Sequence, residues 1–317
     1  MEKIWLKRYP EGMPETIDPE HYNSLLEVFE KSFTDYTDLP AFTNMGKTMS
    51  YDEIDTATKK VASYIQNDLG LKKGDKVAVM MPNLLQTPVT ILGVLRAGCV
   101  VVNVNPLYTV RELEHQLKDS DTTAIFILAN FADTLEKSLA HTDVKHIVVT
   151  QVGDMVGGLK KHIVNFVVKH IKKMVPKFNL PNTIKFSDVL AADEAKYTRP
   201  EMSLSDLAFL QYTGGTTGVS KGAMLSHGNM VGNLEQVSGC LDKVLNRGTE
   251  VVVTALPLYH IFALTANCLT FMKYGGLNIL ITNPRDMPGF VKELGQHKFT
   301  AITGVNTLFN GLLNTPG

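Results

Sequence analysis

The sequence predicts an α/β fold of layered, doubly wound, mostly parallel sheets with flanking helices. Two observations support this prediction. Amphipathic helical segments alternate with short apolar segments from residue 21 to residue 150, and a second alternating region starts near Ser203. Such alternation, with short connections and right-handed crossovers, is typical of a parallel sheet covered by helices. The chain of 317 residues, 44% of them hydrophobic, is long enough to bury a large core.

The elements of the first region follow from the spacing of apolar residues. In segment 21–33, Leu25, Leu26, Phe29 and Phe33 recur at helical spacing, and residues 51–69 repeat the pattern. Short apolar runs between such segments predict strands. The predicted helices are 21–33, 51–69, 84–97, 110–118 and 131–139, and the predicted strands are 76–81, 99–103, 124–128 and 146–150.

The second region repeats the same alternation around a loop rich in glycine and threonine. Its predicted strands are 207–212, 223–225, 251–256, 277–282 and 301–304, and its helical segments are 229–237 and 307–313. We therefore expect an N-terminal α/β subdomain at residues 1–200 and a second α/β subdomain, containing the loop, at residues 201–317.

Composition excludes some classes of protein and favours others. The net charge of −1 gives no overall positive field that would recruit nucleic acid. The three cysteines, Cys99, Cys240 and Cys268, are widely spaced, form no metal-ligand pattern and favour a reducing cytosol. The start of the chain lacks the apolar run of a signal peptide, and no apolar stretch reaches the ~20 residues that span a bilayer. These features predict a cytoplasmic protein.

The segment 159–177 is strongly basic, with six lysines and no acidic residue. Plotted as a helix, Ile163, Phe166, Val167, Ile171 and Met174 share one face. Two interpretations remain open. A basic amphipathic helix can lie on an anionic membrane surface, here the inner face of the cell membrane. An ordinary surface helix would instead pack the apolar face on the sheet.

Residues 211–225, "QYTGGTTGVSKGAML", are the most informative segment of the chain. The hydroxyls of Thr213, Thr216 and Thr217 can donate to phosphate oxygens, and Lys221 supplies a cation with no carboxylate nearby in sequence. The glycines can adopt positive φ and let backbone N–H groups approach an anion; they are Gly214, Gly215, Gly218 and Gly222. This composition predicts a polyphosphate-binding loop, and the alternative is an ordinary surface turn.

The loop is not a Walker A sequence. Lys221 follows Ser220 instead of a glycine and precedes Gly222 instead of serine or threonine. Apolar segments on both sides predict a strand–loop–strand arrangement, whereas a Walker A loop opens a helix.

Other polar residues near the predicted strands have simpler interpretations. His260 lies among apolar neighbours, and a lone histidine there is usually a core residue. His227 is expected to start a helix. Arg111, Glu112 and Glu114 are expected to form a solvated helix face without a chemical role.

The loop sequence "YTGGTTGVSKGAMLSH" resembles the AMP-binding signature of the acyl-adenylate-forming enzymes. Three further segments resemble other motifs of that family in the same order: "MSYDEI", "VLRAGCVVVNVNPLY" and "LPLYHIFAL". The resemblance covers essentially the whole chain and is greatest to bacterial long-chain-fatty-acid–CoA ligases, including "RELEHQL" and "TNPRDMPG". Val110 departs from the proline expected before "RELEHQL", which concerns the start of a helix.

The resemblance implies an activity and its site. It implies a ligase that uses ATP, Mg²⁺ and coenzyme A to convert a long-chain fatty acid through an acyl-adenylate to acyl-CoA. Thr216, Lys221 and His260 are the implied catalytic residues, and Thr216 is the implied metal ligand. The residues implied around ATP are Tyr212, Thr213, Gly214, Gly215, Thr216, Thr217, Gly218, Val219, Ser220, Lys221, Gly222 and Ala223.

The later motifs of the family, including those of its C-terminal domain, do not occur before Gly317. We therefore expect an incomplete N-terminal part of the enzyme that cannot complete the ligase cycle alone. A homodimer is a further expected partner state.

The resemblance also favours an apolar substrate, because members of the family that activate amino acids have an aspartate near the positions of Tyr259 and His260 to pair with the substrate ammonium, and residues 251–282 contain none. Apolar residues dominate there instead, among them Phe262, Leu264, Leu269 and Phe271. The alternatives are an adenylating ligase for another carboxylic acid and a non-catalytic nucleotide- or lipid-binding module.

Overall fold

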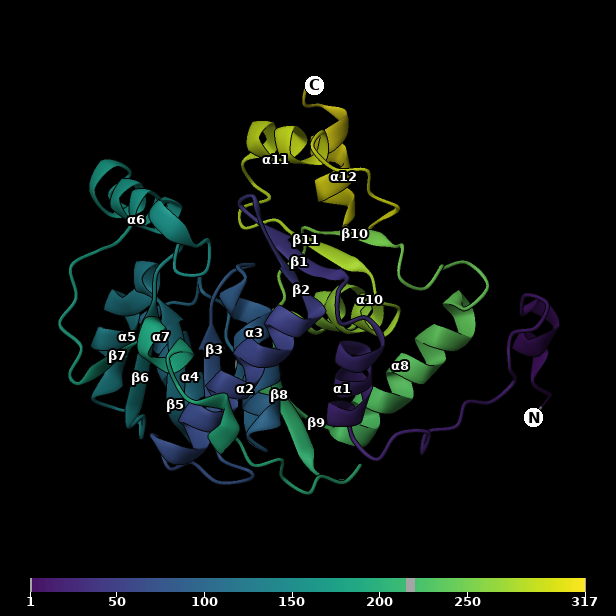
Figure 1. Cartoon of the computed structure of the whole chain (residues 1–317), viewed down its shortest axis with the longest axis horizontal. Helices are drawn as coiled ribbons and strands as arrows, with labels where there is room; N and C mark the ends of the chain where they lie inside the picture. The colour runs from purple at the N-terminus through teal and green to yellow at the C-terminus, as the bar shows by residue number, and fades with distance from the viewer. Residues whose placement is uncertain (1, 215–219, 317) are drawn as a thin grey trace.

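The structure, a computed structural model, describes residues 2–214 and 220–316 (Figure 1). Its strands form one sheet of seven strands and one of five, with helices packed against both. Most strand pairs are parallel. The predicted class of α/β fold, with mostly parallel sheets and flanking helices, is therefore confirmed.

The seven-stranded sheet has the order β7-β6-β5-β3-β4-β8-β9. All its neighbours are parallel except β8 and β9, which form an antiparallel pair. Its strands are β3 (Lys76–Met80), β4 (Val100–Asn103), β5 (Thr122–Leu128), β6 (His146–Thr150), β7 (Thr183–Lys185), β8 (Leu207–Thr213) and β9 (Lys221–Ser226).

The five-stranded sheet has the order β12-β10-β11-β1-β2. Its strands are β1 (Pro40–Asn44), β2 (Lys47–Ser50), β10 (Val251–Thr254), β11 (Leu277–Leu280) and β12 (Ala301–Ile302). The sequence prediction missed the β1–β2 hairpin. Met45 and Gly46 in its two-residue turn both have positive φ, 51° and 74°, as a type I′ turn requires.

The strand pairing crosses the boundary expected near residue 200. β8 and β9 follow that boundary but belong to the seven-stranded sheet, and β8 pairs with β4. β1 lies about 160 residues before that boundary but pairs with β11 of the five-stranded sheet. The two sheets therefore do not divide between residues 1–200 and 201–317.

The α-helices of the described residues include one at each predicted helical segment and four that the sequence analysis did not predict, at Phe186–Leu190, Ile261–Ala263, Thr270–Lys273 and Met287–Leu294. The α-helices are α1 (Leu25–Asp35), α2 (Tyr51–Asn67), α3 (Gln86–Arg96), α4 (Val110–Asp119), α5 (Ala132–Leu139), α6 (Gly158–Phe166), α7 (Phe186–Leu190), α8 (His227–Leu241), α9 (Ile261–Ala263), α10 (Thr270–Lys273), α11 (Met287–Leu294) and α12 (Asn306–Leu313). Five 3₁₀ or π segments complete the order of the described residues: η1 (Ile4–Arg8), η2 (Ala129–Phe131), η3 (Val167–Ile171), η4 (Glu194–Lys196) and η5 (Leu264–Leu269).

α1 begins later than the expected residue 21. Asn23 precedes the helix and donates from its backbone N–H to the carboxylate of Glu27, 2.8 Å away. The residues before Leu25 are therefore tied to the first turn without being part of it, and the helix itself continues two residues beyond Phe33, to Asp35.

Alternation along the strands divides the core between the two faces of the seven-stranded sheet. Val77 and Val79 of β3 belong to the cluster that contains α2 and α3, whereas Ala78 and Met80 face the cluster that contains α4. This is the two-residue period of a strand buried on both faces. α11 and α12 cover the outer face of the five-stranded sheet (Figure 1).

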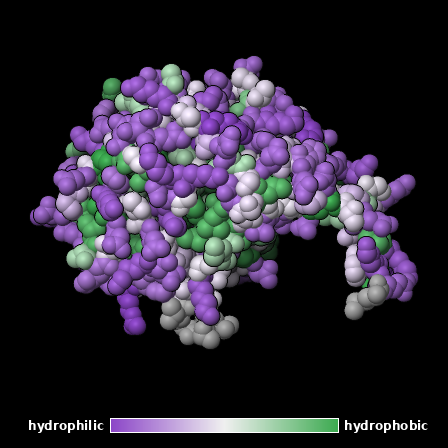
Figure 2. All heavy atoms as spheres, turned by 90° about the horizontal axis from the view of Figure 1, so that it is seen from below, coloured by the Kyte–Doolittle hydropathy of each residue, from purple (hydrophilic) through white to green (hydrophobic). Residues whose placement is uncertain are grey.

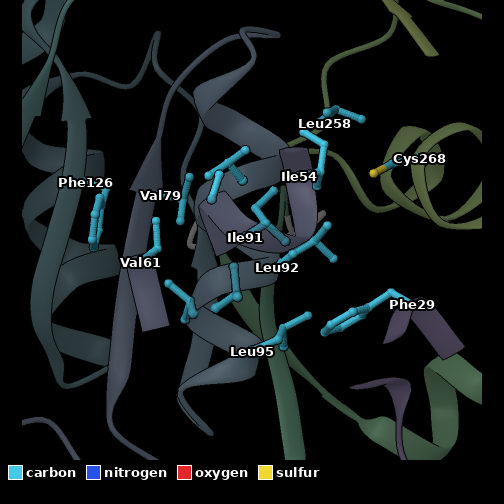
Figure 3. Close-up of a cluster of buried hydrophobic side chains, with 14 of the residues drawn as sticks. Phe29, Ile54, Val61, Val79, Ile91, Leu92, Leu95, Phe126, Leu258 and Cys268 are labelled. Carbon is cyan, nitrogen blue, oxygen red and sulfur yellow. The ribbon is translucent and has the colours of Figure 1, made fainter. Parts of the chain in front are cut away.

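α2 and α3 lie in the core that joins the two sheets. Their buried side chains share one cluster with residues of β3 and β11. Figure 3 shows Ile91 and Leu92 of α3 directed into this cluster, near Val79. Gly93 permits the close contact of the two helices, because a Cβ there would lie 2.5 Å from Val61 Cγ1. The site is thus built on a rigid, fully packed frame.

The basic segment 159–177 does not form one continuous α-helix. α6 passes into the π segment η3, which ends at Ile171, and Lys173 has a φ of 51°. Ile163, Phe166 and Ile171 are 57%, 57% and 65% exposed. The interpretation that this apolar face packs on the body of the protein therefore holds only in part, because Val164 and Val168 pack against the main core while most of the named face is exposed. In the described part of the chain, no helix is long and apolar enough to span a membrane.

Candidate functional site

The ends of the glycine- and threonine-rich loop are held together by two antiparallel strands. Thr213, the last residue of β8, is paired with Lys221, the first residue of β9. This confirms the predicted strand–loop–strand arrangement. The expectations for Gly215, Thr216, Thr217, Gly218 and Val219 fall on residues 215–219, which lie outside the described residues.

A cleft of about 710 Å³ opens beside this pair of strands, at the carboxyl ends of β4 and β8. Ligands of open α/β sheets bind at this edge. The residues that line the cleft are Asn103, Asn105, Tyr108, Arg111, Glu112, His115, Gln211, Tyr212, Thr213, Gly214, Ser220, Tyr259, His260 and Ile261. Five predicted site residues, Tyr212, Thr213, Gly214, Ser220 and His260, are thus brought together.

The other described residues of the predicted loop continue along β9. Lys221 is exposed at the start of the strand, next to Ser220 of the cleft lining. Gly222 pairs with Tyr212 and Ala223 with Gln211. Gly222 and Ala223 therefore belong to the strand pairing beside the cleft and not to its lining.

Tyr212 braces the loop against α4. Its hydroxyl donates to the Asp119 carboxylate over 2.6 Å, at the end of that helix. Burial, together with this hydrogen bond to an acceptor carboxylate, raises the pKa of Tyr212 well above its usual value. The phenol stays protonated and acts as a structural donor.

Gly222 is small for a reason different from the expected one. Gly214 and Gly222 do not have the positive φ that the sequence analysis anticipated for the loop glycines. A Cβ at Gly222 would instead lie 2.9 Å from Cζ of the Tyr212 ring. Glycine at this position leaves room for the Tyr212 ring against the neighbouring strand.

His260 is exposed and lines the cleft. The core interpretation of its sequence environment is therefore wrong. The ring caps α9, and Nδ1 accepts a hydrogen bond from the Phe262 backbone N–H at 3.4 Å. This bond leaves Nε2 as the ring nitrogen available to a ligand.

The apolar residues after His260 divide into two groups. Ile261 lines the cleft and Phe262 is 51% exposed, whereas Leu264 and Leu269 lie in the main core. The last two side chains are therefore core residues and do not line the cleft. η5 carries them into the interior.

His227 has the structural role expected of it. It is the first residue of α8 and is fully buried, and its Nδ1 accepts from the Leu25 backbone N–H at 3.2 Å. Burial lowers the pKa of His227 to about 4. The imidazole is therefore neutral and ties α8 to α1, away from the cleft.

Sequence reasoning missed a chain of buried amides beneath the cleft. Gln211 Nε2 donates to the Tyr259 carbonyl (3.0 Å), and Gln211 Oε1 accepts from Asn103 Nδ2 (3.1 Å). Gln116 Nε2 donates to the Asn103 carbonyl (2.8 Å). The chain links α4, β4 and β8 to the segment that carries His260. The available signal was the polar residue at the carboxyl end of each apolar strand.

The sequence analysis also missed one wall of the cleft. Arg111, Glu112 and His115 of α4 line it, although the first two were expected to face solvent without a role. His115 Nε2 donates to the Ser220 carbonyl at 3.0 Å. Asn103 ends β4, and α4 starts soon after it. That order places the first turns of the helix at the ligand-binding edge, which was the available signal.

The described residues contain no cluster of side chains that could by itself bind a metal ion. Among them, no group of three or more His, Cys, Asp or Glu side chains could hold one. Glu112 is the acidic residue among the described residues of the cleft, and its carboxylate accepts from the N–H and hydroxyl of Thr109. These bonds lower the pKa of Glu112 and use it as a helix cap.

The site is thus a polar cleft at the carboxyl ends of parallel strands, lined by Thr213, Gly214 and Ser220 from the two ends of the loop, which is where open α/β sheets bind their ligands. The chain belongs to the AMP-binding enzyme family, whose model matches residues 29–317.

Curated relatives and solved structures agree with this assignment. The chain is 58% identical over 315 residues to a long-chain-fatty-acid–CoA ligase of Salmonella typhimurium and 52% identical over 317 residues to one of Haemophilus influenzae. Each match covers 99% of this chain and 56% of the relative, so the chain spans about half the length of these proteins. A long-chain-fatty-acid-CoA ligase structure from Archaeoglobus fulgidus has a TM-score of 0.74 at 22% identity. The match covers 97% of this chain and 56% of the Archaeoglobus fulgidus chain, and it shows that the two share a fold.

Proposed function

We propose that this chain is the N-terminal part of a long-chain-fatty-acid–CoA ligase that forms acyl-CoA, AMP and diphosphate from a fatty acid, ATP and coenzyme A. One observation of the structure carries the proposal: both ends of the signature loop and His260 line one cleft. The relatives at 52–58% identity, which are named as such ligases, support the substrate class.

The reaction needs two anions to meet. The fatty-acid carboxylate forms a bond to the α-phosphorus of ATP, and the bond to the bridging oxygen breaks, so that diphosphate leaves with the electron pair. The thiol sulfur of coenzyme A then bonds to the acyl carbon, its proton is lost, and AMP leaves. A carboxylate alone would have to expel oxide, so the adenylate supplies the leaving group.

The cleft residues serve this chemistry by position and charge. Lys221 and the backbone N–H groups of the loop ends neutralise charge on the phosphate oxygens, which is the main demand of phosphoryl transfer. His260 lines the cleft, its Nε2 is not used by the helix cap, and the ring is proposed to contact the fatty-acid carboxylate or the α-phosphate. The amide chain from Gln211 to the Tyr259 carbonyl keeps His260 at a fixed distance from the loop.

We further propose that Mg²⁺ arrives with the phosphates of ATP and is held mainly by them, as is common for this ion. Thr216 is the proposed protein ligand and lies outside the described residues. No step of the mechanism above depends on the position of the ion.

Contact with a membrane surface is a proposal supported by the basic segment. Asn165 holds α6 on its inner side, with Oδ1 accepting from the Gly153 N–H (2.7 Å) and Nδ2 donating to Asp154 (3.0 Å). Outward, Phe166 and Ile171 are exposed among exposed lysines, and α6 lies at the edge of the molecule (Figure 1). Apolar side chains beside lysines suit an anionic lipid surface, on which the fatty-acid substrate would also concentrate.

Charge reversal tests the membrane proposal. The triple variant Lys169→Glu, Lys172→Glu and Lys173→Glu should lose sedimentation with vesicles that contain phosphatidylglycerol. The matched control reverses three exposed lysines elsewhere: Lys72, Lys145 and Lys185. Undiminished binding by the first variant, or equal loss by the control, would reject the proposal.

A homodimer is proposed from the N-terminal segment. Ile4 and Trp5 in η1 are 64% and 50% exposed. Figure 2 shows this segment standing away from the body, with apolar residues in the hollow between them. A second copy could cover these surfaces. Light scattering of the protein and of Trp5→Ser should give a dimer and a monomer, respectively; a monomeric parent would contradict it.

The central proposal is tested by a substrate panel. The C-terminal remainder of the Salmonella typhimurium relative is fused to this chain, and the fusion is called the completed chain. AMP release by the completed chain is measured with palmitate, octanoate, benzoate and leucine. We expect palmitate to give the highest kcat/KM. Preference for benzoate or octanoate would favour the alternative of another adenylating ligase, and ATP binding without any AMP release would favour a non-catalytic module.

A further inference from the structure

We propose that Arg111 and His115 of α4 form a diphosphate site through which the leaving group of the adenylation step passes from the cleft to an outer groove. The proposal rests on the ligase function proposed above. It concerns the wall of the cleft that faces the signature loop, to which the sequence assigned no chemistry.

Two cavities meet at these residues. The outer groove, of about 470 Å³, is lined by Arg111, Glu114, His115, Lys118 and Asp119. The cleft of about 710 Å³ shares Arg111 and His115 with it. α4 therefore stands between the site where the α-phosphate would react and an opening to solvent. An anion that moves from one cavity to the other passes both side chains.

Arg111 is available to bind that anion. Among the described residues it has no ion-pair partner within 4 Å, although three acidic side chains lie on the same helix. Each acid is already engaged: Glu112 by Thr109, Glu114 by His141 at 3.2 Å, and Asp119 by the Tyr212 hydroxyl. A planar guanidinium with two parallel donors matches the oxygens of a phosphate group.

His115 fixes the end of the loop to this wall. The Ser220 carbonyl can only accept, so the 3.0 Å contact requires the proton on Nε2 of His115. Ser220 follows the central residues of the loop directly. His115 thus acts as a positioning residue that sets the distance between the loop and Arg111.

α4 is itself rigidly held, which a positioning role requires. Thr109 and Glu112 form a capping box at its first turn. Leu113 and Leu117 are completely buried, and Gln116 bonds to the Asn103 carbonyl at 2.8 Å. The wall therefore stays in place when the leaving group departs.

The chemistry explains the need for such a site. When the bond between the α-phosphorus and the bridging oxygen breaks, diphosphate carries away the electron pair and about three negative charges at neutral pH. Its release beside AMP is opposed unless a cation replaces the lost contacts. The phosphates of coenzyme A share this chemistry and are the second source of an anion that the experiment must distinguish.

The test measures product inhibition in the completed chain. Arg111→Ala should raise the inhibition constant of diphosphate about tenfold, the size expected for one charge-assisted contact. The inhibition constant of AMP and the KM of coenzyme A should stay unchanged. Arg111→Lys should fall between, and Lys185→Ala, at an exposed site on β7, is the control and should match the parent.

His115 is tested by rescue. His115→Ala should raise the inhibition constant of diphosphate and the KM of ATP, whereas His115→Gln, whose Nε2 can reach the same carbonyl, should restore both values. Equal defects in the two variants would overturn the positioning role.

Three results separate the possible failures. If the parent protein shows no palmitate-dependent AMP release, the ligase proposal itself is wrong. If the parent is active but Arg111→Ala leaves diphosphate inhibition unchanged, the diphosphate site is wrong. If Arg111→Ala raises the KM of coenzyme A instead, the anion at Arg111 belongs to coenzyme A and the assignment to diphosphate is overturned. Titration of the 317-residue chain with sodium diphosphate in a calorimeter gives an independent readout that needs no turnover.

Discussion

α4 and α6 are both amphipathic helices that follow a parallel strand of the seven-stranded sheet, yet they are used in opposite ways. α4 buries Leu113 and Leu117 completely, begins with a capping box and presents its polar side to the cleft. α6 has no buried residue and no side-chain cap, and leaves Ile163 and Phe166 exposed. The comparison teaches that the core fixes the wall of the cleft, whereas the basic segment leaves most of its apolar side exposed, where a membrane surface is the proposed partner.

Core truncation should separate the two helices most strongly. Leu117→Ala in α4 removes a fully buried side chain and should lower the free energy of unfolding by about 3 kcal/mol. Phe166→Ala in α6 removes an exposed one and should change it by less than about 0.5 kcal/mol. Urea denaturation of both variants measures this. Equal losses would show that α6 is packed as firmly as α4.

The buried His227 should make the stability of the protein depend on pH. The folded-state pKa of His227, about 4, lies below the ordinary value of 6.5. The unfolded chain therefore binds the proton first, and stability that is present above pH 6.5 is lost as the pH falls toward 4. The loss should reach at most about 3 kcal/mol.

Urea denaturation between pH 4 and pH 7 checks this prediction. His227→Asn keeps an acceptor for the Leu25 N–H without a titrating ring, and should remove that part of the pH dependence. An unchanged pH profile in the variant would assign the dependence to other groups. His260→Asn, which alters an exposed ring, serves as the matched control for stability.

The brace between the loop strand and α4 should have an intermediate effect. Tyr212→Phe removes the hydroxyl that donates to the Asp119 carboxylate and should cost about 2 kcal/mol of unfolding free energy. Asp119 itself is exposed, so the cost comes from loss of a hydrogen bond to a charged acceptor by the buried Tyr212. Thermal or urea unfolding measures the loss, and a cost near zero would mean that water replaces the phenol without penalty.

The helix cap should give the smallest effect. Thr109→Ala removes the capping box of α4 and should cost about 1 kcal/mol. Thr109→Ser, which keeps the hydroxyl, should restore most of that stability. If the alanine variant unfolds like the parent, the start of α4 is held by packing alone.

Most of the fold could be predicted because it depends on local patterns. The alternation in β3 and the strands on both sides of the loop follow directly from apolar spacing, and the structure confirms them. The β1–β2 hairpin was missed because its place is set by β11, more than 200 residues later in the chain. Distant pairing also explains why the sheets cross residue 200.

The site was predicted only in part, for a related reason. The loop and His260 were found through their motifs, but Arg111 and His115 look in sequence like any solvated helix face. Their role depends on where β4 places α4 relative to β8, and on a contact to the Ser220 carbonyl across the cleft. The exposure of α6 could not be read from sequence either, because periodicity shows an apolar face but not what covers it.

The central claim is that the cleft beside the β8–β9 pair activates a fatty acid at the α-phosphate of ATP. Palmitate-dependent exchange of labelled diphosphate into ATP by the completed chain tests it most directly. The account predicts exchange in the parent and a fall of about a hundredfold in Thr216→Ala and in Lys221→Ala. Near-normal exchange in both variants, or no exchange in the parent, would contradict it.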